Sequence, residues 1–563
     1  MFRWRHVLGL CIVVVLLGVL VRMGETGALR KQNAMRGGPD QPPVEMDGSS
    51  LRESTLDLAP VGSPAADRGG TGSLANRQEP RGSAGGDHRD PDVVPDEYLL
   101  FFDGEEGFER FLADAKMLRI EVIGTLPRWR ALNLRTASIA GLERLLGERY
   151  GTFSFEQNSF VRAPDRTGVP GRGVPFAASA LDWLGVAGKN STWGEGITIA
   201  VLDTLVQDHP SLKGVAIRRF SVLGEHVVEH GDYAGHGTAV ASLLAGSGGA
   251  VAGIAPAANV LAVRVMTDDG VGDAFTLADG IILAVDQGAD VLNLSLGMQS
   301  DSRIVREAIE YALENGVAVV AAAGNDGSGS VQFPARYDGV TAVSAVDAMG
   351  THADYANTGE AIDIAAPGVG INAGWSDGET VSLGGTSVST PFVAGALASI
   401  LSEESSASAD EATALLLGHA DDSGAPGADP VFGEGVLNVN RVLQRNEEGI
   451  VDAALSGFYI APEPVESGAR LMWVSAENRG TEPIASLLVR VQVGDGLSQD
   501  QKFRDVAVGD VVSVPVEIRL DEVEEAGILI RSAAAPVGVT DTNPANDGMR
   551  TRIRLVTVEE DVP

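Results

Sequence analysis

The chain has 563 residues, with 42 lysines and arginines against 77 aspartates and glutamates, and its formal net charge is -35. This length predicts three or four units rather than one domain. The charge argues against nucleic acid as a partner, because an acidic surface repels phosphate backbones. The single cysteine, Cys11, excludes an intramolecular disulfide, and no group near it in the sequence could activate it as a nucleophile.

The first 28 residues have the pattern of an export signal. Arg3 and Arg5 precede a run of apolar, glycine and cysteine residues from Val7 to Val21. The length of this run is intermediate between that of a signal-peptide core and the ~18 residues needed for a membrane-spanning helix. Small residues at Thr26–Ala28 suit a signal peptidase, so 1–28 predicts a cleaved signal peptide, with an uncleaved signal anchor as the alternative. In both cases we expect the protein to be extracytoplasmic: secreted or periplasmic, or anchored in the membrane by residues 7–21.

Two segments of different character follow the signal. Residues 29–94 are rich in Gly, Pro, Ser, Arg and Asp and have no apolar periodicity, which predicts a disordered linker. In residues 95–163, short apolar strands alternate with two segments of helical periodicity, in the order β-α-β-β-α-β. This order indicates a ferredoxin-like α+β unit.

Residues 176–445 predict a doubly wound α/β domain with a mainly parallel sheet. Continuous apolar runs, typical of strands buried on both faces, occupy 198–202, 259–265, 290–296 and 317–323. Segments 274–288 and 302–316 have helical periodicity, and each ends at a glycine. Ligands of such sheets bind beyond the carboxyl ends of the strands, where Asp203, 295–297 and Asn325 fall.

The last part of the chain, 450–563, predicts a β-sandwich. Apolar residues alternate with polar ones in several short runs, the clearest being 487–493 and 512–520. Short, half-buried strands separated by turn-rich segments are typical of an Ig-like fold.

Three motifs supply the groups of a serine nucleophile. Ser387 lies in Gly-Gly-Thr-Ser-Val-Ser-Thr-Pro, His236 lies in Gly-His-Gly-Thr, and Asp203 ends an apolar strand. A serine hydroxyl attacks a carbonyl only when a base removes its proton, and a carboxylate orients and stabilises that base. We also expect Ser387 to open a helix whose first turn holds Pro391.

The chain order Asp, His, Ser resembles that of the subtilisin-like serine proteases, or subtilases, and differs from that of chymotrypsin. The resemblance implies that residues 95–163 are an inhibitory propeptide, which would be removed by self-cleavage between 163 and 176. It also implies that the side-chain amide of Asn325 stabilises the oxyanion. The C-terminal unit resembles the cell-adhesion-related, or CARDB-like, Ig-type modules through Glu477–Gly480 and a late Asn-x-x-Asn turn.

The same resemblance assigns a substrate site. An extended substrate would pair with the segment 295–297, and the pocket before the scissile bond would be lined by 322–324 with Gln332 at its base. The implied substrate-binding residues are Ser295, Leu296, Gly297, Ala322, Gly324 and Gln332. These segments contain no acidic residue at the expected positions, so we expect a broad apolar or neutral preference rather than strict cleavage after Lys or Arg.

Three departures from the subtilase pattern stand out. Leu205 follows Asp203-Thr204 where subtilases usually have glycine, which predicts an altered path of the loop beside the carboxylate. Met298 replaces a second glycine after Gly297, which predicts a narrowed substrate groove. The segment after His236 lacks the insertion that carries the strong calcium site of subtilisin. We expect no required cofactor and no metal ligands of zinc type, and calcium at unassigned sites stays open.

The predicted function is therefore exported serine endopeptidase activity through an acyl-enzyme. We expect protein or peptide substrates, the chain's own propeptide as an intramolecular inhibitor, no nucleic acid and a monomeric state. Two alternatives stay open at this point: a membrane-anchored, dedicated processing protease, and a non-catalytic surface-binding protein with a vestigial protease fold.

Overall fold

A computed structural model gives the fold. It describes residues 52–58, 91–136, 139–146, 149–164, 173–186, 188–223, 231–248, 251–465, 469–496, 498–519 and 527–555. All of them belong to one compact unit, Gly48–Pro563. The predicted export signal lies outside the described residues. Within the described ranges, no helix is both long enough and apolar enough to cross a membrane.

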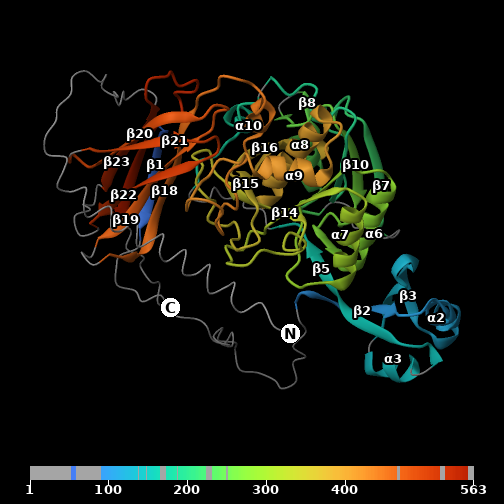
Figure 1. Cartoon of the computed structure of the whole chain (residues 1–563). Helices are drawn as coiled ribbons and strands as arrows, with labels where there is room; N and C mark the ends of the chain where they lie inside the picture. Colours follow the sequence, from blue (N-terminus) through green and yellow to red (C-terminus); the bar gives the residue numbers. More distant parts are fainter. Residues whose placement is uncertain are drawn as a thin grey trace, which may run out of the picture. The chain divides into compact units, whose positions relative to one another are not determined.

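The N-terminal module has the predicted element order and a ferredoxin-like sheet (Figure 1). Its elements are β2 (Val93–Phe102), α2 (Glu105–Leu118), β3 (Glu121–Leu126), β4 (Ala131–Arg135), α3 (Ile139–Leu146) and β5 (Phe153–Arg162). The strands pair in the antiparallel order β5-β2-β4-β3. The two helices cover one face of this sheet, where the buried ring of Phe111 contacts Phe102 at a tilt and Tyr150 edge to face.

The α/β domain predicted at 176–445, called the catalytic domain after the role that the resemblance implies, is built on a seven-stranded parallel sheet of order β15-β14-β13-β12-β6-β10-β7. The strands are β6 (Thr198–Asp203), β7 (Ile217–Ser221), β10 (Asn259–Arg264), β12 (Val291–Leu294), β13 (Ala318–Ala322), β14 (Val340–Val346) and β15 (Ile364–Pro367). The main helices are α5 (His236–Ala245), α6 (Ala274–Asp286), α7 (Arg303–Glu314) and α8 (Thr386–Glu403). Smaller elements are α4 (Ala180–Trp183), β8 (Ser247–Gly248), β9 (Val251–Ala252), β11 (Val271–Asp273), β16 (Ile371–Gly374), β17 (Thr380–Leu383), α9 (Ala409–Leu417) and α10 (Val439–Gln444).

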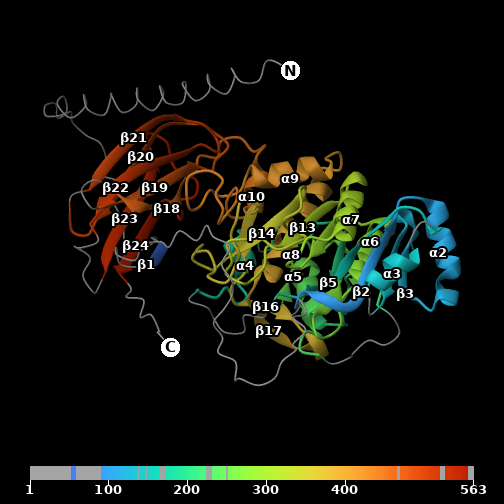
Figure 2. The ribbon, with the colours of Figure 1, turned by 90° about the horizontal axis from the view of Figure 1, so that it is seen from below.

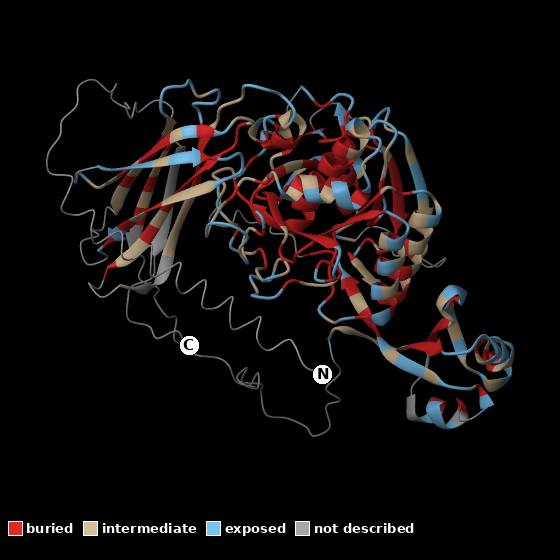
Figure 3. Ribbon diagram, in the orientation of Figure 1, coloured by how far each residue is buried: buried red, intermediate tan, exposed pale blue. Residues whose placement is uncertain are grey.

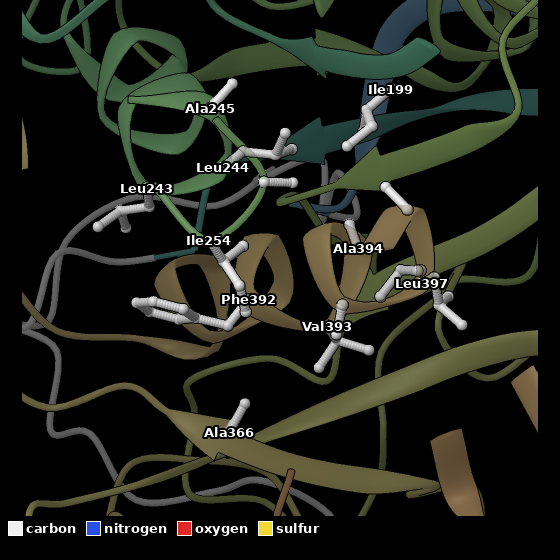
Figure 4. Packing of buried hydrophobic residues seen from close by; sticks show 14 of the residues in the cluster. Ile199, Leu243, Leu244, Ala245, Ile254, Ala366, Phe392, Val393, Ala394 and Leu397 are labelled. Atoms are coloured by element: carbon white, nitrogen blue, oxygen red, sulfur yellow. The ribbon is translucent and has the colours of Figure 1, made fainter. Parts of the chain in front are cut away.

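Burial on both faces explains the continuous apolar runs of the central strands. In β6, Ile199 and Val201 belong to the core shared with α5 and α8, whereas Ala200 and Leu202 belong to the core shared with α6 and α7. Figure 3 shows the sheet and α8 buried inside the domain. Figure 4 shows the first core, with Phe392 and Leu397 of α8 packed beside residues of α5. The fold is thus the predicted doubly wound α/β architecture.

The C-terminal domain is a sandwich of two antiparallel sheets. Its strands are β18 (Ala453–Pro464), β19 (Arg470–Asn478), β20 (Ile484–Val493), β21 (Gln499–Val506), β22 (Val511–Ile518), β23 (Ile528–Pro536) and β24 (Gly548–Leu555). One sheet has the order β18-β19-β22 and the other has the order β24-β23-β20-β21. Val474, Val489 and Val514 lie in the common core, as the period-two pattern predicts.

One strand corrects the predicted domain boundaries. The segment β1 (Arg52–Leu58) lies inside the predicted linker, yet it pairs in parallel with β24 at the edge of the second sheet of the sandwich (Figures 1 and 2). Residues 29–94 are therefore not disordered throughout, and β2 also begins before residue 95. The rest of the linker, apart from residues 91–94, lies outside the described residues.

Buried charges join the sandwich to the catalytic domain. Glu477 of β19 is 2% exposed and forms ion pairs with Arg441 of α10 and with Arg479. Arg479 also contacts Asp421, which precedes α10, at 2.8 Å. Each buried guanidinium therefore has a carboxylate partner, as a charge removed from water requires.

Candidate active site

The strand β6 and the helix α5 bring Asp203 and His236 together. Asp203 is the last residue of β6 and fully buried, and His236 is the first residue of α5. Nδ1 of His236 lies 2.8 Å from Oδ1 and 2.9 Å from Oδ2 of Asp203. A Cβ atom on Gly237 would lie 2.6 Å from the carbonyl oxygen of Thr204, which explains why glycine follows the histidine.

Thr204 fixes the carboxylate and the start of α5 in one arrangement. Its backbone N–H donates to Oδ1 of Asp203 at 2.6 Å. Its hydroxyl oxygen accepts the N–H of Gly237 at 2.9 Å and donates to the carbonyl oxygen of Tyr233. Leu205 follows this anchored turn and is 36% exposed, so the loss of the usual glycine is accommodated at the surface.

The second ring nitrogen of His236 is left free for chemistry. Nε2 is buried and has no hydrogen-bond partner among the described residues. Because Nδ1 is engaged by a carboxylate, Nδ1 carries the proton in the neutral ring and Nε2 presents a lone pair. This tautomer is the one required of a base that accepts the proton of a serine.

Ser387 is the second residue of α8 and 4% exposed. Pro391 lies inside α8 and not in its first turn, so that prediction is wrong and one backbone donor to the carbonyl oxygen of Ser387 is missing. The hydroxyl of Ser295 replaces this donor, at 2.8 Å from that oxygen. The side chain of Asn293 in turn donates to Ser295 at 2.9 Å.

Asn325 lies beside the nucleophile and is held by the residue preceding it. Oδ1 of Asn325 accepts hydrogen bonds from the N–H and the hydroxyl of Thr386, at 2.9 and 3.0 Å. This orientation leaves Nδ2 on the other side, where a Cβ atom on Gly385 would lie 2.7 Å from it and 3.2 Å from Oγ of Ser387. Nδ2 and Oγ are therefore at most about 6 Å apart, so the amide lies beside the nucleophile.

The predicted substrate edge already carries an extended segment of the chain. Gly297 and Arg162, the last residue of β5, exchange two backbone hydrogen bonds of 2.9 Å in an antiparallel bridge. The N–H of Ala163 donates to the carbonyl oxygen of Gly270 at 2.8 Å. The end of the N-terminal module thus lies between two backbone edges in the way that strand addition requires.

The predicted pocket residues divide into two groups. Gly297, Gly324 and Gln332 come together, since Cβ atoms on the two glycines would lie 2.0 and 2.8 Å from side-chain atoms of Gln332. Ser295, Leu296 and Ala322 are almost fully buried, and among the described residues no contact of theirs with Gln332 places them at the same point. The prediction for Met298 is wrong, because its side chain is 2% exposed within the core and does not narrow a groove.

Sequence reasoning missed three residues of the site. Asp326 accepts hydrogen bonds from the side-chain amides of Gln332, at 2.5 Å, and Gln299, at 3.1 Å, so an acidic group is present at the pocket. Thr204 and Thr386 position the carboxylate and the amide. Each of the three is adjacent in sequence to a predicted residue, and that adjacency is the signal that could have identified them.

Across the described ranges, no three His, Cys, Asp or Glu side chains are grouped so that they could hold a metal ion. This finding leaves the question of calcium elsewhere in the chain untouched.

Comparison with known proteins agrees with this geometry. The model of the subtilase family, Peptidase S8, matches residues 194–435. Subtilisin Savinase of Lederbergia lenta is 39% identical over 227 residues, which cover 40% of this chain and 83% of the relative. The thermostable alkaline protease of Halalkalibacterium halodurans is 35% identical over 273 residues, covering 48% and 74%. Thermitase of Thermoactinomyces vulgaris is 37% identical over 220 residues, covering 38% and 78%.

The chain therefore belongs to the subtilase family. It is a serine endopeptidase.

Proposed function

We propose that the chain is an exported serine endopeptidase that matures by cutting itself, with Asp203, His236 and Ser387 as its catalytic triad. The observation that carries the proposal is the state of His236: one ring nitrogen bonds a fully buried carboxylate, and the other is buried without a partner among the described residues. Such a base has its proton on the correct nitrogen before a substrate arrives.

The proposed reaction assigns each of these residues a role. His236 Nε2 takes the proton of Ser387 as Oγ attacks the substrate carbonyl carbon, and Asp203 stabilises the imidazolium that forms. Asn325 Nδ2 and the backbone N–H of Ser387 donate to the oxyanion of the tetrahedral intermediate. The imidazolium then gives its proton to the leaving amine, and an acyl-enzyme remains. Water, activated by the same histidine, attacks this ester and restores Ser387.

The N-terminal module is proposed to be the inhibitor of the domain that it precedes. Its last residues occupy the backbone edge at Gly297, which a substrate would need. The proposed cut lies between residues 163 and 176, directly after this contact. Export is proposed from the apolar run at 7–21, with cleavage of the signal and retention as an anchor as the two outcomes that the mature N-terminus would separate.

The test is to express the full chain with Ser387→Ala and to follow its length and its reaction with a serine-directed phosphonate. We expect the variant to stay at full length and unlabelled, while the wild type is shortened and labelled. Ser389→Ala is the matched control, because this buried hydroxyl, two residues further along α8, donates to the carbonyl oxygens of Ala366 and Gly385. Normal shortening of Ser387→Ala would contradict self-processing, and absence of label on the wild type would contradict the triad.

The oxyanion role of Asn325 has a separate test. Asn325→Ala should lower kcat by about 10²–10³ with little change in KM, because the lost donor acts mainly in the transition state. This magnitude comes from subtilisin, a relative, and so is an expectation by analogy. Steady-state kinetics on a peptide substrate would measure it, and an unchanged kcat would remove Asn325 from the mechanism.

A further inference from the structure

The strand β1 is in an unexpected place for its position in the sequence. It precedes the N-terminal module, yet it is the edge strand of the sandwich at the other end of the chain, beside β24 (Figure 2). The pairing is parallel and runs from Arg52 opposite Met549 to Leu58 opposite Leu555. A strand beside β24 covers backbone donors and acceptors that an uncovered edge would present to other chains.

The register matches residue types on both faces of the sheet. The pairs along the ladder include Glu53 with Arg550, Thr55 with Arg552, Leu56 with Ile553, Asp57 with Arg554, and Leu58 with Leu555. Acidic positions thus fall opposite arginine positions, and leucines fall opposite apolar positions, among which Ile553 is fully buried in the core of the sandwich. A slip of one residue would place acidic positions opposite apolar ones and leucines opposite arginines, so the sequence disfavours that slip.

The chain order gives this pairing a consequence. The proposed cut between residues 163 and 176 separates β1 from β24 in the covalent chain without touching the ladder between them. We infer that β1 is a clasp, and that it keeps the N-terminal segment, including the apolar run 7–21, bound to the sandwich after the cut. The cleaved enzyme is then a two-chain protein and not a free protease with its N-terminal segment lost. The existence of the clasp is independent of self-processing, whereas its role after maturation rests on the proposed function.

The clasp also changes how inhibition ends. The N-terminal fragment is attached at two places, through the module at Gly297 and through β1 at β24. When the module undocks, β1 holds it near its site at an effective concentration on the order of millimolar, so that it docks again. Lasting release therefore requires a second event, either a cut between residues 58 and 91 or separation of β1 from the sandwich.

The experiment measures how strongly β1 alone holds the N-terminal fragment, without a contribution from the module and without self-cleavage. In the full chain with Ser387→Ala, a recognition site for an added sequence-specific protease is inserted between residues 75 and 90. After digestion in detergent, the fragment that ends there is attached only through β1. Gel filtration at micromolar concentration then measures the share of this fragment that elutes with the rest of the protein, and we expect it to be retained.

Charge exchange tests the register. Glu53→Arg with Asp57→Arg should weaken retention about tenfold or more, because arginine positions in the ladder would then lie opposite arginine positions. Adding Arg550→Glu and Arg554→Glu should restore retention. The matched control is Asp40→Arg with Asp47→Arg, which makes the same charge change outside the strand and should leave retention unchanged.

The outcomes separate the two proposals. Loss of the fragment from the parent protein, an effect of the control as large as that of the strand variant, or failure of the exchanged pairs to restore retention would each overturn the clasp. Thermal unfolding of the uncut variants identifies any that fail to fold. Such a variant is replaced by Glu53→Gln with Asp57→Asn. For this replacement we expect weaker retention of the fragment, and unchanged retention would overturn the clasp. Because the cut is made by an added protease, failure of self-processing does not affect this result.

Discussion

The catalytic domain contacts its two neighbours through different kinds of interaction. At the N-terminal module, backbone edges pair: β5 with β11 and Arg162 with Gly297. One carboxylate, Glu156, accepts hydrogen bonds from Ser302 and Arg303 at the start of α7. At the sandwich, buried ion pairs cross the boundary. Backbone edges can be offered to another strand once they separate, whereas separated buried charges lose their partners. The module also shares a buried apolar cluster with the catalytic domain, to which Leu99 and Phe101 belong, so separation there exposes apolar surface, whereas separation at the sandwich breaks buried ion pairs. The first junction is therefore better suited to opening than the second.

The largest expected effect is at the sandwich junction. Glu477→Ala leaves Arg441 and Arg479 short of a buried carboxylate, which should lower the free energy of unfolding by about 3–5 kcal/mol. Denaturant unfolding of the Ser387→Ala protein would measure this without self-digestion. Asp500→Ala is the matched control, because its ion pair with Arg490 is at the surface and should contribute less than about 1 kcal/mol. Equal losses in both variants would mean that the junction is not held by its buried charges.

A second change tests whether the N-terminal module can be lost while the catalytic domain stays folded. Gly107 lies in α2, where a Cβ atom would be 2.0 Å from the backbone carbonyl oxygen of Tyr150. Gly107→Ala should destabilise the module by about 1–3 kcal/mol, because backbone cannot move aside easily. Limited proteolysis should then cut the module first. Gly104→Ala is the control, since nothing lies within 4 Å of its Cβ position, and an intact module in Gly107→Ala would show that α2 shifts to make room.

The sequence predicts some of these regions far better than others. Residues 198–202 and Asp203 could be predicted because a strand buried on both faces needs an unbroken apolar run, and because three motifs in one order are specific. The role of Ser295 could not be predicted. Its hydroxyl donates to the carbonyl oxygen of Ser387 in place of the backbone N–H that Pro391 lacks, and Pro391 is far along the chain. The strand 52–58 is too short and too polar to stand out from a linker, and only its partner reveals its pattern.

The same distinction explains the error at Met298. A family pattern indicates which residue is unusual, but it does not show which way the side chain points. Backbone pairing with Phe333 turns the side chain of Met298 into the core. Asp326 was missed for the opposite reason, because its effect on the pocket depends on the side chain of Gln332.

At the sandwich junction, the pH dependence of the free energy of unfolding distinguishes Asp422 from Glu477, which is held in buried ion pairs. Burial, and after it the charge of Glu477, raises the pKa of Asp422 to about 6, and Oδ2 of Asp422 has no partner among the described residues. A folded-state pKa above the unfolded value of about 4 means that this group favours folding below about pH 4 and that this contribution is lost as the pH rises through about 6.

Asp422→Asn should therefore raise the free energy of unfolding by about 1–3 kcal/mol at pH 8, since two pKa units set an upper bound of about 3 kcal/mol, and should change it little near pH 4. Unfolding in denaturant at both pH values measures the difference. A variant that is less stable at pH 8 would show that the charged form of Asp422 is needed at the junction, as Glu477 is.

The smallest expected effect concerns the junction suited to opening. Burial raises the pKa of Glu156 above its ordinary value, although Ser302 and Arg303 donate to it and act in the opposite direction. Glu156 therefore binds its proton more tightly when the module is docked than when it is undocked. This carboxyl group favours docking most at low pH, and its contribution is lost as the pH rises through the raised pKa.

Glu156→Gln removes the titration and keeps an acceptor oxygen. In uncut Ser387→Ala protein, exchange of the backbone amides of Ala163 and Gly297 reports undocking, because both N–H groups are bonded across the junction. Between pH 5 and pH 8, protection should fall more in the parent than in Glu156→Gln, and equal slopes would mean that Glu156 does not control this junction.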